Sequence, residues 1–232
     1  NHFDHQLISQ IADSFEEFDK DNNCRSIVLC STGKHFCAGA NFGKDRDMQD
    51  KADPYSELYT QAVRLFRNKK PVIAAVQGGA IGGGLGLSLA ADFRIGCSES
   101  RFSANFSRLG FHQGFGTTIT LPRVVGNQNA TMMMLTGRRL KGEEALEIGL
   151  IDYLVPHLEV REKAIELAEE ISQSGPLAIQ SIRATIRSGL ADKVEEIVSW
   201  ELSEQMRLQS TDDFKEGIKA SLERRKPNFK GS

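Results

Sequence analysis

The chain has 232 residues, with 29 basic and 31 acidic side chains and a net charge of −2. This balance argues against a nucleic-acid partner, because such proteins usually carry a basic face. No apolar run approaches the roughly 18 residues that a membrane span needs, so no membrane segment is expected. The four cysteines show no metal-ligand or CxxC spacing, which predicts free thiols, no metal and a cytoplasmic location.

Apolar spacing predicts the first half of the chain as alternating helices and strands. An amphipathic helix is expected over residues 3–18 and a buried strand over 26–30, followed by a loop rich in glycine and alanine. Residues 42–53 show no apolar period. We then expect a helix over 54–68, a strand over 72–76, a helix over 83–91 and a strand over 93–97.

The second half is predicted to be almost entirely helical from residue 117 onward. The exception is a short strand over 151–155, and helices are expected over 159–173, 177–188, 191–208 and 211–224. Buried strands that alternate with helices indicate an α/β fold with covered sheets. No linker composition divides the chain. We therefore predict one domain over 1–232, with a core over 1–190 and a helical portion over 191–232.

The glycines gather in one place, with six of them among the nine residues 78–86. Glycine lets a backbone approach a ligand closely, and a helix N-terminus offers unpaired N–H groups. Such a segment can hold a phosphate, form an oxyanion hole, or simply pack a helix tightly on a strand. The phosphate-loop motif is absent because no lysine follows the cluster, and the glycines do not have the spacing of the dinucleotide-binding motif. The nucleophile-elbow motif is also absent, because Ala90 stands where it requires glycine.

A second loop favours the oxyanion hole. Residues 35–41 (HFCAGAN) also follow a predicted buried strand. Two such loops can bring two backbone N–H groups to one carbonyl oxygen, and each donor is worth roughly 3 kcal/mol of transition-state stabilisation.

At these residues the chain resembles the crotonase superfamily, the enoyl-CoA hydratases and isomerases. The similarity runs in family order over nearly the whole chain. It is carried by FCAGAN (36–41), KPVIAAVQG (70–78), IGGG (81–84), ADFRI (91–95), LPRVVG (121–126), LTGRRL (135–140), ALEIGLI (145–151) and RKPNF (225–229). Relative to the family, an opening strand or two is missing, so we expect further sequence upstream of Asn1.

The resemblance implies a spiral of ββα repeats with a helical C-terminal trimerisation region, assembled as a homotrimer or a dimer of trimers. It implies a lyase or isomerase that holds an acyl-CoA thioester and uses no metal or redox cofactor. The amides of the family's oxyanion hole map to Ala40 and Gly83. Gly82 and Gly84 are expected to let the acyl group approach, and Ala38 to contact the substrate.

The family's acid and base positions are where this sequence departs from the pattern. The two glutamates of the hydratases align with Gly86 and Phe106, and the further acidic position of some isomerases aligns near Gly114. Glycine and phenylalanine transfer no protons, whereas a positioned acid or base contributes about 10²–10⁴-fold. We therefore predict weak or absent ordinary hydratase activity.

Residues 105–116 occupy the family's catalytic neighbourhood and offer replacements. Histidine is the residue type suited to proton transfer near neutral pH, so His112 is a candidate acid or base, with a structural role as the alternative. Arg108 is a candidate for binding a substrate carboxylate or for a salt bridge, and Asn105, Ser103 and Gln113 are candidates for orienting a water or a polar acyl group. Asp45 and Asp47 are weaker candidates for a base, with solvated charges as the alternative, and His35 is expected at the surface. Four phenylalanines predict either an apolar acyl pocket or ordinary core: Phe42, Phe106, Phe111 and Phe115. The basic run near the C-terminus, which includes Arg224 and Lys226, predicts either contacts with CoA or a solvated tail.

Two functions from other classes stay open at this point. A non-catalytic acyl-CoA binding protein would keep the hole and lose the bases, as positions 86, 106 and 114 suggest. A nucleotide binder with a phosphate cradle is the weakest reading, because the cradle's lysine is missing.

Overall fold

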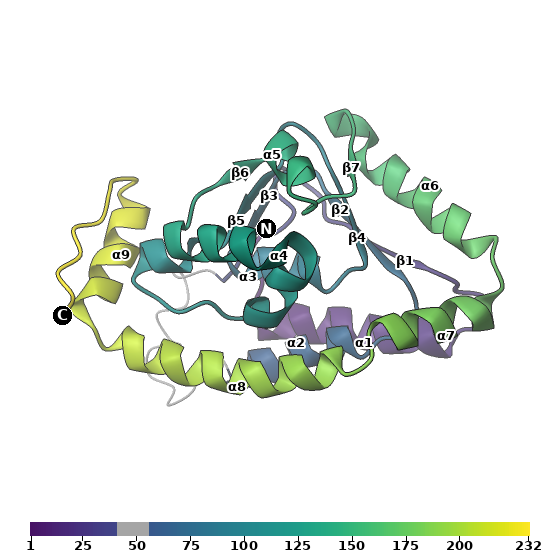
Figure 1. Ribbon diagram of the computed structural model, residues 1–232, viewed down its shortest axis with the longest axis horizontal. Coiled ribbons are helices and arrows are strands. Elements are labelled where there is room, and N and C mark those ends of the chain that lie inside the picture. The colour runs from purple at the N-terminus through teal and green to yellow at the C-terminus, as the bar shows by residue number, and fades with distance from the viewer. Residues whose placement is uncertain (41–55) are drawn as a thin grey trace.

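The computed structural model describes residues 1–40 and 56–232. The helices are α1 (His5–Lys20), α2 (Ser56–Phe66), α3 (Gly83–Leu89), α4 (Thr117–Thr136), α5 (Gly142–Glu147), α6 (Val160–Ser172), α7 (Pro176–Ile186), α8 (Leu190–Gln209) and α9 (Asp212–Leu222). The strands are β1 (Ile27–Leu29), β2 (Val72–Val76), β3 (Gly79–Ile81), β4 (Phe93–Gly96), β5 (Arg101–Ser103), β6 (Leu140–Lys141) and β7 (Tyr153–Leu154). Figure 1 shows their arrangement.

Two small sheets form the centre of the molecule. The larger sheet is parallel and has the order β1-β2-β4-β7, and the smaller sheet has the order β3-β5-β6 with β6 antiparallel to β5. From β2 to β5 the consecutive strands alternate between the two sheets, because β2 leads directly into β3 and β4 into β5. A helix follows each such pair, which gives the repeating ββα spiral.

The larger sheet is covered on both faces, which explains the unbroken apolar run of β2. All five residues of β2 are buried. Ile73 and Ala75 pack with α6 on one face, while Val72, Ala74 and Val76 belong to the main core on the other. A strand buried on both faces needs apolar residues at every position, and this is the signal by which the sequence revealed it.

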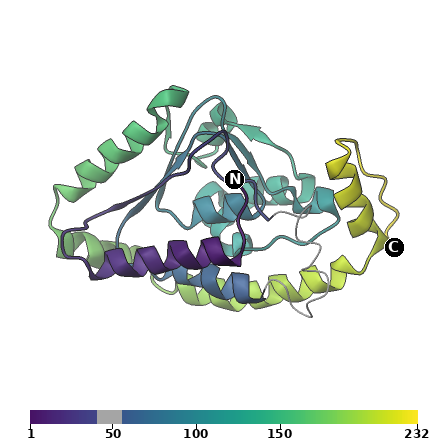
Figure 2. The same ribbon diagram turned by 180° about the vertical axis from the view of Figure 1, so that it is seen from behind.

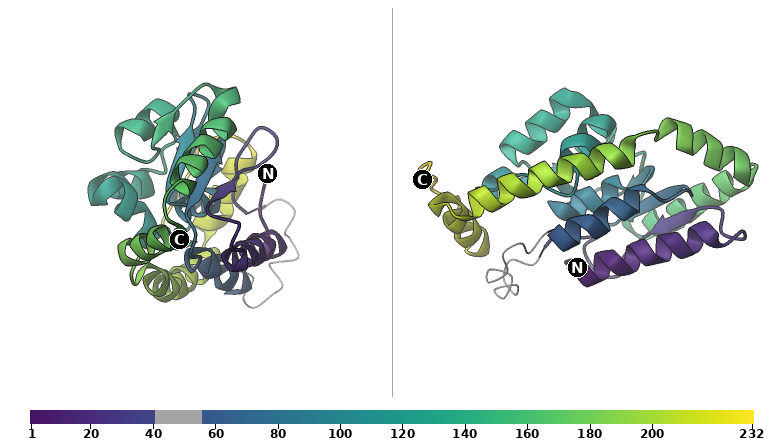
Figure 3. Two further views of the ribbon diagram at one scale, coloured as in Figure 1. Left: turned by 90° about the vertical axis from the view of Figure 1, so that its right-hand side faces the viewer. Right: turned by 90° about the horizontal axis from the view of Figure 1, so that it is seen from below.

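The long helices form a layer beneath the sheets. Seen from behind and from below, α1, α2 and α8 lie side by side, and α9 folds up at the far end of α8 (Figures 2 and 3). This arrangement brings the C-terminal helices of the same chain to the region of the two glycine loops. Within the described ranges no helix is both long and apolar enough to cross a membrane.

Three strands were missing from the sequence prediction. β3 lies inside the glycine cluster, β5 has three residues, and β6 has only two. Such short strands show no usable period, and glycine normally disfavours a strand. Their pairing is set by neighbouring strands rather than by local propensity.

Candidate active site

The two glycine loops are joined by backbone hydrogen bonds. Cys37 N–H donates to the Gly79 carbonyl at 2.9 Å, and Ile81 N–H donates to the Cys37 carbonyl at 3.0 Å. The backbone then turns at Gly39 in the first loop and at Gly82 in the second. Their φ angles are +82° and +55°, values that favour glycine. A Cβ on Gly39 would lie only 2.9 Å from the Ile81 carbonyl oxygen, so the loops meet too closely for a side chain there.

This junction places Ala40 and Gly83 in the wall of one pocket. Gly83 is the first residue of α3, so its N–H has no acceptor within the helix. Among the residues that the structure describes, neither the Ala40 nor the Gly83 N–H donates a backbone hydrogen bond. Two N–H groups at one pocket can receive one carbonyl oxygen, as an oxyanion hole does.

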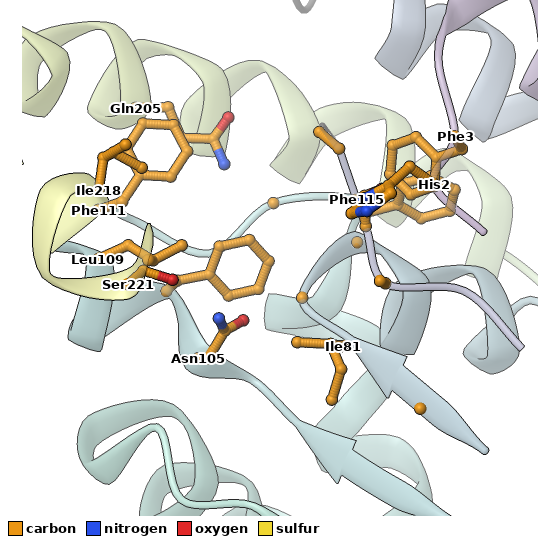
Figure 4. Close-up of a pocket in the computed structure, with 18 of the residues that line it drawn as sticks. His2, Phe3, Ile81, Asn105, Leu109, Phe111, Phe115, Gln205, Ile218 and Ser221 are labelled. Atoms are coloured by element: carbon orange, nitrogen blue, oxygen red, sulfur yellow. The ribbon is translucent and has the colours of Figure 1, made fainter. Parts of the chain in front are cut away.

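The pocket has a volume of about 470 Å³ and is largely apolar. Side chains reach it from both glycine loops, from the 3₁₀ turn η2 (Asn105–Leu109), and from α2, α8 and α9, as the close-up in Figure 4 shows in part. Its apolar wall is made by Phe3, Leu58, Ile81, Phe106, Leu109, Phe111, Phe115, Ile218 and Leu222. A cavity of this size and character suits an acyl group.

Most of the residues predicted from the sequence meet in this pocket. Its lining includes Ala38, Ala40, Gly82, Gly83, Phe106, Phe111 and Phe115. The three described phenylalanines are each under 9% exposed and are therefore both core and pocket wall. Phe42, Asp45 and Asp47 lie outside the described residues.

Gly84 has a packing role in this structure. It does not line the pocket, and a Cβ on it would collide with the backbone carbonyl of Cys37. Gly84 therefore allows α3 to sit tightly against the loop that carries Ala40.

The acid and base slots are filled by other side chains. A Cβ on Gly86 would lie 2.7 Å from the Cβ of Phe115, and a Cβ on Gly114 would lie 2.5 Å from Nε2 of Gln205 and collide with the Tyr59 hydroxyl. The third slot holds the buried ring of Phe106. The slot at Gly86 thus lacks both a carboxylate and the room for one, and a side chain at position 114 would have to displace the ends of Tyr59 and Gln205.

His112 lies outside the pocket lining. Its Nδ1 is 2.8 Å from the Gln113 carbonyl oxygen, and its own carbonyl accepts a hydrogen bond from Nε2 of Gln205 at 3.0 Å. These contacts favour the structural role over the catalytic one.

Positive charge reaches the pocket through residues other than those predicted. Arg224 and Lys226 are exposed and do not line it, whereas Arg101 and Arg139 do. His35 is exposed as expected but also lines the pocket, and its Nδ1 accepts from Gly79 N–H at 3.2 Å. Partial burial, aided by the charge of Lys34, lowers the pKa of His35.

Two polar residues of the pocket escaped the sequence analysis. Tyr59 on α2 and Gln205 on α8 are 6% and 1% exposed, and the Tyr59 hydroxyl donates to Oε1 of Gln205 at 2.6 Å. They stand 146 positions apart in the sequence and lie on amphipathic helices. Neither residue belongs to a short motif, so only the packing of α2 against α8 reveals the pair.

A separate group of potential metal ligands lies away from the pocket. Cys97, Glu99 and His157 offer ligand atoms within 4.8 Å of one another, and none of them lines the pocket. Burial raises the pKa of the Cys97 thiol, and its sulfur lies 3.3 Å from the Gln77 carbonyl oxygen. Burial thus favours the neutral thiol form of Cys97 over the thiolate.

Comparison with known proteins identifies the family. The family model for enoyl-CoA hydratase/isomerase matches residues 1–232. The chain is 32% identical over 232 residues to crotonyl-CoA hydratase of Syntrophomonas wolfei, covering 99% of this chain and 89% of the relative. It is 31% identical over 239 residues to 1,2-epoxyphenylacetyl-CoA isomerase of Escherichia coli, covering 100% of this chain and 90% of the relative.

A solved structure agrees with these sequence matches. Carnitinyl-CoA hydratase from Mycobacterium avium superposes with a TM-score of 0.87 at 30% identity, covering 99% of this chain and 90% of that one. The ββα spiral expected from the sequence is thereby confirmed. This chain belongs to the enoyl-CoA hydratase/isomerase family.

Proposed function

We propose that the pocket binds an acyl-CoA thioester with its carbonyl oxygen between the N–H groups of Ala40 and Gly83. The observation that carries this proposal is that both residues line one pocket and that their N–H groups donate to no described backbone acceptor. A thioester whose carbonyl oxygen becomes negative, as in an enolate, gains most from such donors because they strengthen as charge develops. The reaction is accordingly a lyase or isomerase step through a thioester enolate.

Ordinary hydration is expected to be weak or absent. Adding water to a double bond requires an activating base and a protonating acid. The positions that supply them in family hydratases are Gly86 and Phe106, and Phe115 occupies the space beside Gly86. The test is an assay of crotonyl-CoA hydration, monitored as the loss of the absorbance of its conjugated double bond. Turnover at the rate of ordinary hydratases would contradict the proposal.

The alternative function is a non-catalytic acyl-CoA binding protein. The closed slots at Gly86 and Gly114 favour it, because they leave the hole without its usual partners. Exchange of the α-protons of bound butanoyl-CoA in deuterium oxide separates the two functions. An enzyme that stabilises the enolate incorporates deuterium faster than the free thioester, whereas a simple binder leaves the exchange rate unchanged.

The same proposal extends to assembly and conditions of work. Leu177, Ile182 and Ile186 of α7 and Trp200 of α8 are more than half exposed, which suits burial in a homotrimer or a dimer of trimers. Light scattering tests this, and a monomer would contradict it. The enolate chemistry calls for no metal or redox cofactor, so activity should survive a chelator. Cell fractionation tests the cytoplasmic location.

A further inference from the structure

The acyl pocket contains a pair of buried polar side chains that the enolate chemistry leaves unused. Tyr59 and Gln205 line the pocket although most of the surrounding wall is apolar. Burying polar groups among apolar ones is unfavourable unless they are hydrogen-bonded. Here the Tyr59 hydroxyl donates to Oε1 of Gln205 at 2.6 Å, and Nε2 of Gln205 donates to the His112 carbonyl at 3.0 Å.

The backbone is shaped to admit this pair. A Cβ on Gly114 would stand 2.5 Å from Nε2 of Gln205 and would collide with the hydroxyl of Tyr59. Glycine at this position is therefore what allows two neutral hydrogen-bonding groups to occupy the space that a side chain at 114 would fill. The pair is a built element of the pocket wall.

Gln205 has hydrogen-bonding capacity to offer a ligand. A glutamine amide carries two N–H donors. The His112 carbonyl takes one of them, and the other has no acceptor among the described residues. Figure 4 shows the amides of Gln205 and Asn105 both pointing into the pocket, the first from α8 and the second from η2. An oxygen atom on the bound acyl chain is the group that such donors recognise.

The charge of the surroundings specifies the kind of oxygen. Tyr59, Gln205 and Asn105 are all neutral. Arg101 on β5 and Arg139 between α4 and β6 also line the pocket, but no described hydrogen bond joins either arginine to these three side chains, and Arg101 donates to the Ser98 and Ser100 carbonyls. A carboxylate would need a cation beside it once it is buried. A hydroxyl or keto oxygen needs only a hydrogen bond from these amides, and the Tyr59 hydroxyl, which donates to Oε1 of Gln205, holds the Gln205 amide in place.

Resting on the proposed function, we infer that the preferred substrate is an acyl-CoA whose acyl chain carries a neutral hydroxyl or keto oxygen. The Tyr59–Gln205 pair recognises that oxygen. A plain alkyl chain enters the same pocket but leaves the Gln205 amide without a hydrogen-bond acceptor. The alkyl thioester therefore binds more weakly.

The experiment compares CoA thioesters of equal chain length by calorimetry on the intact protein. Butanoyl- and hexanoyl-CoA are titrated beside their hydroxy- and oxo-substituted analogues, with wild type, Gln205→Leu and Tyr59→Phe. We expect at least one substituted thioester to bind at least tenfold more tightly than its alkyl counterpart in wild type. Gln205→Leu should abolish this preference and Tyr59→Phe should reduce it.

Matched controls are Gln128→Leu and Tyr153→Phe, which change exposed residues outside the pocket and should keep the preference. Equal binding of alkyl and substituted thioesters to wild type overturns the inference and leaves the proposed function standing. A preference that persists in a folded Gln205→Leu protein also overturns it. Binding of none of the thioesters overturns the proposed function and the inference together. The wild-type comparison decides even where a variant fails to fold.

Discussion

The Cβ of Phe115 lies 2.7 Å from the point where a Cβ on Gly86 would stand. Phe115 is 1% exposed, has a positive φ of 64°, and packs its ring 5.5 Å from that of Phe3. Its position is therefore fixed by both backbone and packing. The ring closes the slot from which family hydratases present a glutamate, so this chain lacks both the carboxylate and the space for it.

Restoring the glutamate alone should accordingly fail. We expect Gly86→Glu to lower the free energy of unfolding by about 1–3 kcal/mol, because overpacking a core displaces its neighbours. Hydration of crotonyl-CoA should stay low. Urea unfolding and the hydration assay measure both effects. Gly175→Glu is the control, because the nearest atom to a Cβ there, at 3.8 Å, is in ordinary contact. A stable Gly86→Glu protein with hydratase activity would contradict the argument.

Asp92 should be a major stabilising residue. Its carboxylate accepts from Nε of Arg183 at 2.8 Å and from a terminal nitrogen of Arg187 at 2.9 Å, which joins α7 to the start of β4. All three side chains are at most 17% exposed, and burial lowers the pKa of Arg187 to about 10. Removing the carboxylate leaves the buried guanidinium groups of Arg183 and Arg187 without their acidic partner. We expect Asp92→Asn to lower the free energy of unfolding by about 3–5 kcal/mol.

The control for Asp92 is another aspartate in an ion pair. Asp192 pairs with Arg67 at 3.1 Å, and its side chain is 75% exposed. Asp192→Asn should change the free energy of unfolding by at most about 1 kcal/mol, since water screens exposed pairs. Equal effects of the two substitutions in urea unfolding would refute the structural role of Asp92.

Glu201 should make stability depend on pH in an unusual direction. It is fully buried on α8 and accepts hydrogen bonds from the N–H groups of Gly116 and Thr118 and from the Thr118 hydroxyl, but burial outweighs these bonds and raises its pKa to about 7. Between about pH 4.5 and 7 the folded protein keeps a proton that the unfolded chain has lost. This contribution to stability therefore falls as pH rises through that window, by up to about 3 kcal/mol.

The comparison with Glu201→Gln isolates this effect from all other carboxylates. The variant loses one acceptor and should be less stable at pH 5 by about 1–3 kcal/mol. The difference in free energy of unfolding between wild type and variant should shrink as the pH rises to 7. A difference that grows with pH would show that the hydrogen bonds dominate over burial.

Arg139 should contribute more to CoA binding than Arg224 does. Arg139 lines the pocket, whereas Arg224 lies outside its lining. We expect Arg139→Ala to weaken the binding of a CoA thioester by about three- to tenfold and to reduce its salt dependence, because exposed charges attract phosphates through a screened field. Arg224→Ala should bind as wild type does. Calorimetry at two salt concentrations measures this, and a larger loss for Arg224→Ala would favour the prediction made from the basic C-terminal run.

The sequence predicted the features that have a local signal. β2 was evident from five consecutive apolar residues, and α8 from its helical period. The proposed hole residues Ala40 and Gly83 were chosen because each lies in a loop that follows a strand and because the family resemblance aligned them, and the structure places both residues in one pocket. The spiral itself followed from that resemblance, because strands of two or three residues carry no period of their own.

The missing features depend on contacts between distant segments. Tyr59 and Gln205 reach the pocket from two different helices, where each fits an ordinary amphipathic pattern. The ring of Phe115 fills the slot beside Gly86 only because the chain before α4 turns at positive φ. His112 is a candidate acid or base by residue type, and the structure shows it outside the pocket lining with Nδ1 near a backbone carbonyl. The direction in which a side chain points depends on the packing of distant segments, and no sequence window contains it.

The central claim is that the Ala40 and Gly83 amides polarise a thioester carbonyl, and infrared spectroscopy tests it most directly. The carbonyl band of isotope-labelled butanoyl-CoA would be recorded by difference, free and bound to the protein. Two N–H donors withdraw electron density from the C=O bond, so the account predicts a bound band at clearly lower frequency than the same band in water. A bound band at the frequency found in water, or above it, would contradict the account.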